Sequence, residues 1–199
     1  MARTERQVRA APVRFETRED NNEPHICGYF AVYNSNYEIW DDMSESIAPG
    51  AFSGSLSGDI RALVNHDSTL VLGRTKAHTL ELRDDEHGLW ADISVNPEDR
   101  SAMDLYARVQ RGDVDQCSIG FRILKEETEW RDDGSVHWTI QEAELFEVSA
   151  CTFPAYEQTN ISARTAQREA LRGERLEAWK TKMKGKVNRH GTEGTAAEK

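Results

Sequence analysis

A serine lies in a stretch of sequence whose residue pattern suits nucleophilic catalysis. Read as a β-strand, residues 115–123 alternate between an apolar face and a polar face that carries Ser118 and Gly120. The glycine removes side-chain bulk beside the hydroxyl, so an extended substrate would have room in front of it. A half-buried strand that happens to carry a serine explains the same pattern. The apolar face consists of Cys117, Ile119, Phe121 and Ile123.

A histidine and a carboxylate elsewhere in the chain could complete the chemistry of this serine. His66 ends a predicted strand just before a turn, where an imidazole can exchange protons near neutral pH; a surface histidine without a role is the alternative. Glu147 interrupts a nearly apolar strand, which is costly unless the carboxylate is paired. It could orient a histidine or face solvent, and Glu144 and Asp67 compete with it. With Ser118, such a set would supply nucleophile, general base and orienting acid for acyl transfer.

Motifs for other chemistries are missing from the sequence. Ser118 is not framed by the Gly-x-Ser-x-Gly elbow of α/β-hydrolases, and there is no glycine-rich phosphate-binding loop. The histidines lack the short spacings of metal ligands, and no Cys-x-x-Cys pair exists. We therefore expect neither a metal nor an organic cofactor. The cysteines at positions 27, 117 and 151 are predicted to be buried, reduced thiols.

Composition limits the partners and the compartment. The chain has 199 residues and a formal net charge of −10, which does not suit binding to a nucleic-acid backbone. The sequence has neither a run of about eighteen apolar residues nor an apolar signal segment near residue 1. We therefore expect no nucleic-acid or membrane partner, and a location in a cytosol or inside a particle assembled there.

Short strands separated by turn residues are predicted throughout residues 13–156. One helix interrupts them: Asn96 would cap it, Pro97 suits its first position, and Gly112 ends it. The strand with the candidate serine follows this helix, and a hairpin turn is expected at residues 132–135. The other predicted strands cover residues 26–33, 60–65, 70–74, 79–82, 89–95 and 145–153.

The composition divides the chain into three parts. Residues 1–12 are polar and basic and are predicted to be a flexible arm. Residues 13–156 form the predicted α+β, β-rich domain. Residues 157–199 form a charged tail, with a helix over residues 161–184 and a disordered stretch from residue 185. The central part alone has enough apolar residues to build a hydrophobic core.

Several motifs occur in a fixed order along the chain. They are Asn65-His66-Asp67, Val71-Leu72-Gly73-Arg74-Thr75, Cys117-Ser118-Ile119-Gly120-Phe121, Glu147-Val148-Ser149 and Thr152-Phe153-Pro154-Ala155. In order and spacing these motifs resemble the prohead maturation serine proteases of tailed bacteriophages. Segments 28–33 and 47–52 and the turn at 85–89 resemble that family as well, so the likeness spans residues 26–155.

The resemblance implies a fold and a set of site residues. The family is similar in fold to the herpesvirus assemblins, which have a β-barrel with surrounding helices. On this match Ser118 is the nucleophile, His66 the general base and Glu147 the third member, where the related assemblins use a second histidine. The donors of the oxyanion hole are not assigned by the match: backbone N–H groups, Arg122 or Arg74 could supply them.

The resemblance also implies an activity and its setting. The protein would be an endopeptidase inside the assembling procapsid in the host cytoplasm, cleaving scaffold or the scaffolding segment of the major capsid protein, and finally itself. The charged tail would be a self-cleavage or assembly segment, and the assemblins suggest a homodimer. The alternatives are a non-enzymatic capsid assembly or scaffold protein on the same barrel, and a serine esterase.

Overall fold

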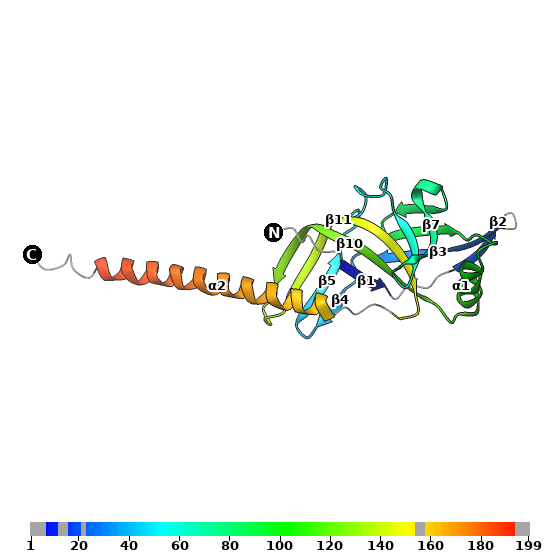
Figure 1. Cartoon of the computed structure of the whole chain (residues 1–199). Coiled ribbons are helices and arrows are strands. Elements are labelled where there is room, and N and C mark those ends of the chain that lie inside the picture. The colour runs from blue at the N-terminus through cyan, green and yellow to red at the C-terminus, as the bar shows by residue number, and fades with distance from the viewer. Residues whose placement is uncertain (1–6, 12–15, 21–22, 154–157, 194–199) are drawn as a thin grey trace, which may run out of the picture. The chain divides into compact units, whose positions relative to one another are not determined.

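The computed structural model describes residues 7–11, 16–20, 23–153 and 158–193. The chain divides into two compact units, Met1–Glu157 and Gln158–Lys199 (Figure 1). In the described residues, the first unit is strand-rich and contains helix α1, and the second consists of the long helix α2. The fold is therefore α+β, as the sequence predicts.

The larger sheet of the first unit is built around a long antiparallel hairpin. Its strands β10 (Gln116–Trp130) and β11 (Val136–Cys151) meet at the turn predicted for residues 132–135. The sheet order is β1-β10-β11-β5-β4, where β1 is Gln7–Ala11, β5 is Met43–Ile47 and β4 is Tyr37–Trp40. Strand β6 (Arg61–Val64) pairs in parallel with the end of β11, and β7 (Asp67–Arg74) pairs with β6. The hairpin thus connects every strand of this sheet.

The smaller sheet has four strands in the order β2-β3-β9-β8. These are β2 (Glu16–Asp20), β3 (Glu23–Val32), β9 (Gly88–Ser94) and β8 (Leu80–Asp84), and all neighbours are antiparallel. The hairpin predicted for residues 79–95 is confirmed by the pairing of β8 with β9. Among the described residues the strands lie in two sheets and do not close into one barrel.

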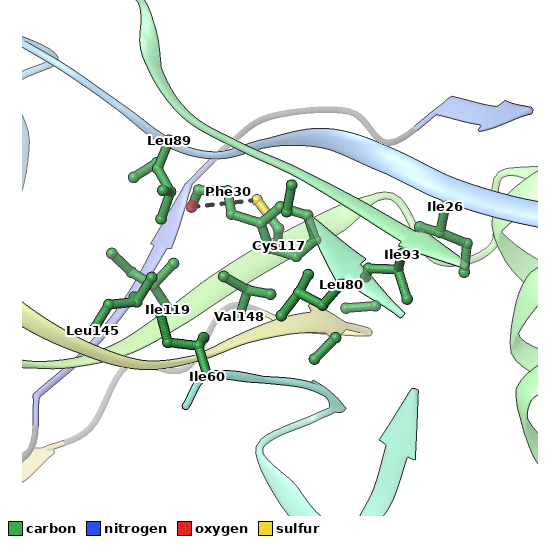
Figure 2. Packing of buried hydrophobic residues seen from close by; sticks show 14 of the residues in the cluster. Ile26, Phe30, Ile60, Leu80, Leu89, Ile93, Cys117, Ile119, Leu145 and Val148 are labelled. Atoms are coloured by element: carbon green, nitrogen blue, oxygen red, sulfur yellow. Dashed lines mark hydrogen bonds between the residues drawn. The ribbon is translucent and has the colours of Figure 1, made fainter. Parts of the chain in front are cut away.

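The two sheets share one hydrophobic core. Alternation along β3, β9, β10 and β11 turns every second side chain inward, so apolar residues from all four strands meet (Figure 2). The apolar face predicted for residues 115–123 lies in this core. Fully buried members that Figure 2 labels are Ile26, Phe30, Ile60, Leu89, Ile93, Cys117, Ile119 and Val148.

The helix before β10 begins later than the sequence predicts. Helix α1 spans Arg100–Arg111, and its cap is Asp99, whose carboxylate accepts the N–H groups of Ser101 and Ala102. Asn96 instead closes the preceding turn by accepting the N–H of Glu98. Asp99 is the cap because its side chain reaches two of the otherwise unbonded N–H groups at the helix start. Gly112 ends the helix as expected, in the left-handed conformation with φ of 85°.

Two expectations for the chain ends differ from the structure. Gln7–Ala11 were expected to belong to a flexible arm, but they form strand β1 because the edge of β10 offers backbone partners. A disordered stretch was expected from residue 185, yet helix α2 spans Gln158–Glu193, since each added turn of an existing helix contributes its own hydrogen bonds.

A short 3-10 helix, η1 (Thr75–Ala77), follows β7. In the described part of the chain, none of the helices combines the length and the apolar character needed to cross a membrane.

Gly88 lies where β9 approaches the backbone of β3 most closely. A Cβ on Gly88 would lie 2.0 Å from Ala31 O, whereas a Cβ on Gly54 meets open space. We expect Gly88→Ala to lower the free energy of unfolding by about 2 kcal/mol or more, because the two strands must separate. Gly54→Ala should change it by less than about 0.5 kcal/mol. Urea denaturation measures both, and equal midpoints would contradict the close approach.

Candidate active site

The histidine predicted to act as a base sits in a tight turn between β6 and β7. Asn65 and His66 both have left-handed backbone conformations, with φ of 49° and 62°. The turn is tied to β11 at two points: Asn65 N–H donates to Ala150 O at 2.9 Å, and Asn65 Oδ1 accepts Thr152 N–H at 2.9 Å. The parallel pairing of β6 with β11 therefore brings the imidazole to the end of β11.

His66, Glu147 and Ser149 form a closed ring of hydrogen bonds. Nδ1 of His66 lies 2.6 Å from Glu147 Oε1. Ser149 Oγ donates to Glu147 Oε2 at 2.5 Å and accepts the backbone N–H of His66 at 3.3 Å. The carboxylate is buried, so its negative charge is held by these donors. With Nδ1 bonded to the carboxylate, Nε2 is left as the ring nitrogen that can accept a proton.

Ser118 shares a face of the sheet with this ring. It lies directly opposite Ser149 in the β10–β11 pair, and Gly120 lies opposite Glu147. Side chains that face each other across an antiparallel pair point the same way, with Cβ atoms about 5 Å apart. The structure therefore brings Ser118 and Glu147 together on the face of the hairpin opposite the hydrophobic core, with His66 bonded to Glu147.

The serine hydroxyl is not hydrogen-bonded to the imidazole. Ser118 is fully buried, and its Oγ donates to the backbone oxygen of Arg9 in β1 at 2.9 Å. Strand β1 pairs with β10 over the register Gln7↔Phe121 to Ala11↔Cys117. The candidate nucleophile is therefore covered by the first strand of its own chain.

The competing acids are engaged elsewhere. Glu144 pairs with Arg122 on the partly exposed part of the hairpin. Asp67 accepts the N–H and the hydroxyl of Thr69 at 2.8 and 2.6 Å, and these hydrogen bonds hold the pKa of Asp67 below its usual range. Among these three carboxylates, Glu147 is the one hydrogen-bonded to the imidazole.

The arginines considered for the oxyanion hole are likewise bound to carboxylates. Arg122 pairs with Glu144, and the guanidinium of Arg74 bonds both oxygens of Asp59 at 2.7 and 2.6 Å. Within the described part of the chain, no three His, Cys, Asp or Glu side chains come together in a way that could hold a metal ion.

A thiol lies beside the imidazole. Cys151 Sγ is 3.8 Å from Nε2 of His66, and the side chain is buried. Burial raises the pKa of Cys151 to about 12, and the nearby charge of Glu147 acts in the same direction. Because only the thiolate is a strong nucleophile, this shift disfavours a reactive cysteine–histidine pair. The burial predicted for all three cysteines is confirmed, and their thiols are free in the structure.

A groove adjoins the histidine turn. It has a volume of about 410 Å³ and lies between β7 and the start of α1. Val64 and Thr69, which flank the turn, contribute to its wall, and Leu70 and Leu105 make it partly apolar. There is room here for a side chain of a molecule bound near His66.

Sequence reasoning missed the role of Ser149 and the position of Arg9. Ser149 is two residues after Glu147, so both must lie on one face of a strand, and this spacing was a usable signal. Arg9 gave no such signal, because its place depends on β1 pairing with a strand more than 100 residues away.

Comparisons with known proteins agree with one another. The sequence profile of the family described as caudovirus prohead serine protease matches residues 11–173. The prohead protease of Enterobacteria phage HK97 is 34% identical over 148 residues, which cover 72% of this chain and 61% of that protein. Among solved structures, the capsid assembly protease of bacteriophage T4 is similar in fold, with a TM-score of 0.51 and 10% identity, over 75% of this chain and 98% of that one.

Ser149→Ala tests whether the hydrogen-bonded ring contributes to stability. The substitution removes the hydroxyl donor of the buried Glu147 carboxylate, so we expect the free energy of unfolding to fall by about 1–3 kcal/mol. Ser57→Ala, at an exposed loop serine, should stay within about 0.5 kcal/mol of the unmodified chain. Chemical denaturation gives both values, and an unchanged free energy of unfolding in Ser149→Ala would contradict a stabilising role of the ring.

Cys151→Ala tests the protonation of the thiol. The pKa of Cys151 is raised in the folded chain to about 12, from 9.0, so the folded state favours the thiol. Stability from this group is full below about pH 9 and is lost as the pH rises toward the folded-state pKa. We expect the free energy of unfolding to fall more steeply above about pH 9 in the unmodified chain than in Cys151→Ala. Identical pH dependence in the two proteins would show that the thiol is not shielded.

Proposed function

Since the chain belongs to the family of caudovirus prohead serine proteases, we propose that it is a serine endopeptidase that acts in phage capsid maturation. One observation supports this most: a buried carboxylate and a serine share one face of the β10–β11 hairpin, and an imidazole from the β6–β7 turn is hydrogen-bonded to that carboxylate. The match spans 61% of the length of the HK97 protein, so activity, substrates and partners are all part of the proposal.

The proposed mechanism is hydrolysis through an acyl-enzyme. The Ser118 hydroxyl leaves Arg9 O and gives its proton to Nε2 of His66, while Oγ bonds to the scissile carbonyl carbon. The imidazolium, held by the carboxylate of Glu147, passes that proton to the leaving amine as the C–N bond breaks. Water then attacks the ester, again with His66 as base, and releases the acid and the serine. No metal or organic cofactor takes part in these steps.

We propose that the substrates are the scaffold or the scaffolding segment of the major capsid protein, and finally the chain itself, inside the assembling procapsid in the host cytoplasm. In this proposal residues 13–156 are the protease domain, and residues 157–199 are a self-cleavage or assembly segment. Exposed apolar side chains on α2 support a role in assembly, because such a stripe can dock on another protein: they are Leu176, Trp179 and Met183. Neither nucleic acid nor membrane is a proposed partner.

We propose that the fold is related to that of the herpesvirus assemblins. Two sheets around one core, with the serine on a strand and the histidine at a strand end, support it. The homodimer that those proteins suggest is proposed on the same resemblance. Sedimentation equilibrium of the full chain tests it, and a monomer at all concentrations would exclude it.

A non-enzymatic assembly protein is the second candidate. The covered state of Ser118 favours it, because a buried hydroxyl bonded to Arg9 O cannot meet a substrate as it stands. The His66–Glu147–Ser149 ring argues against a non-enzymatic protein, since a buried carboxylate bonded to an imidazole is costly to keep without a role. A serine esterase, the third candidate, has no specific observation in its favour.

Co-expression with the capsid protein encoded by the same genome tests the proposal. The unmodified chain should shorten the capsid protein, while Ser118→Ala should leave it at full length, as measured by intact mass. Glu147→Gln should slow cleavage by about 100-fold or more, because the imidazolium loses its charged partner. Ser57→Ala, at an exposed serine, is the matched control and should cleave normally.

The possible outcomes separate the candidates. Full-length capsid protein with both the unmodified chain and Ser118→Ala would exclude the protease and leave the assembly protein. Cleavage that survives Glu147→Gln but not Ser118→Ala would keep the protease and remove Glu147 from the site.

A further inference from the structure

Strand β1 occupies the edge that a substrate strand would use. An extended peptide can bind a protein by adding a strand to a sheet edge, and β10 has β11 on its other side. The edge beside Ser118 is therefore the one at which a peptide could join β10, and Gln7–Ala11 lie there antiparallel to it. The chain thus holds a segment of itself where its proposed substrate would lie.

The hydroxyl of Ser118 singles out one residue of this segment. It donates to the backbone oxygen of Arg9 at 2.9 Å, while Ala10 lies opposite Ser118 in the register. A serine nucleophile attacks the carbonyl carbon of the scissile bond. Arg9 therefore stands where the residue before the cleaved bond would stand, and Ala10 where the residue after it would stand.

The side chain of Arg9 enters a built site for a cation. Its Nε and one terminal nitrogen donate to the two carboxylate oxygens of Glu45 in β5 at 2.6 and 3.1 Å, and the other terminal nitrogen donates to Val8 O at 2.8 Å. The guanidinium carbon lies 5.9 Å from the ring centroid of Phe121. Glu45 is 1% exposed and Arg9 is 7% exposed. Geometry of this kind, with two donors on one carboxylate, matches the planar fork of an arginine, while the buried negative charge favours any cationic side chain.

The walls of this site are mostly apolar, with Ser35 and Ser46 as further polar residues. A small cavity of about 40 Å³ remains beside Arg9 and is lined by Phe30, Val32, Tyr37 and Ile47, among others. In such surroundings a carboxylate is costly without a positive partner, so the site favours a long basic side chain over a neutral or acidic one. Glu45 supplies the charge, and the apolar walls fit the methylene stem.

We propose that Glu45 determines specificity by binding an arginine or lysine of the substrate, and that β1 is a bound segment of the chain that imitates that substrate. The inference rests on the proposed protease function and names the class of peptide it cleaves. In cleavage, Ser118 Oγ bonds to the carbonyl carbon of the basic residue, the C–N bond to the next residue breaks, and the amine leaves with the proton taken from Ser118. Water then releases the new carboxylate.

The first test uses the unmodified full chain with its capsid protein and maps the new termini by mass spectrometry. The cuts should follow Arg or Lys. Cuts that follow other residues would overturn the inference while leaving the protease function intact. No cut at all, with Ser118→Ala and the unmodified chain alike, would mean that the proposed function has failed and the inference with it.

The second test compares two substitutions that a purely structural ion pair would make equivalent. The probe is a peptide that copies residues 4–13, with a second peptide that carries Gln at the position of Arg9. Glu45→Gln should lower kcat/KM for the arginine peptide by about 100-fold. The value should then be close to kcat/KM for the glutamine peptide. Arg9→Gln should raise kcat/KM for the arginine peptide, because β1 then competes less well for Glu45. If both substitutions lower kcat/KM to the same extent, the pair is structural and the inference is wrong.

A reversed pair covers the case in which either single variant does not fold. Arg9→Glu combined with Glu45→Arg keeps opposite charges at the two positions, and its folding can be checked by thermal denaturation. The double variant should prefer a peptide with Glu at the position of Arg9 over the arginine peptide. An unchanged preference for arginine would show that Glu45 does not choose the substrate residue.

Discussion

The antiparallel pairing of β10 with β11 is the interaction on which the candidate site depends. One face of the hairpin supplies Cys117, Ile119 and Val148 to the core, and alternation then forces their neighbours outward. Ser118 meets Ser149 on that outward face because the register pairs them. A shift of the register by one residue would exchange the two faces, so the same pairing that builds the core also fixes the geometry of the candidate site.

Two buried carboxylates impose the next constraint. Glu147 is held by His66 and by a serine on its own strand, whereas Glu45 is held by Arg9 from another strand. A buried negative charge requires donors close by, and each carboxylate orders the segment that carries its donors. Glu147 thereby orders the histidine turn, and Glu45 orders β1. The catalytic proposal and the specificity proposal thus have the same physical origin.

The sequence predicted those features that depend on local pattern. Strand alternation placed Ser118 opposite the apolar face, and the cost of a carboxylate in an apolar strand made Glu147 a candidate acid beside Glu144 and Asp67. The start of α1 was predicted three residues too early, because Asn96 and Asp99 are both good caps and the sequence does not show which one reaches the helix. Strand β1 was missed because five mixed residues form a strand only when the edge of β10 is present to bind them. The bond between Arg9 and Glu45 has the same cause, since it joins two strands that are distant in sequence.

Because β1 belongs to the same chain as Ser118, a substrate must compete with β1 for the edge of β10. Access to Ser118 therefore depends on the concentration of the substrate. A segment tethered to its own site competes as if it were present at about millimolar concentration. A free substrate that binds the same edge with equal strength must reach a comparable concentration before it displaces β1. A dilute protein would therefore leave Ser118 covered, whereas substrates crowded around the chain could exchange with β1. If Glu45 binds both segments through the same cation, the exchange replaces one buried ion pair by another, and the carboxylate keeps a positive partner in both bound states.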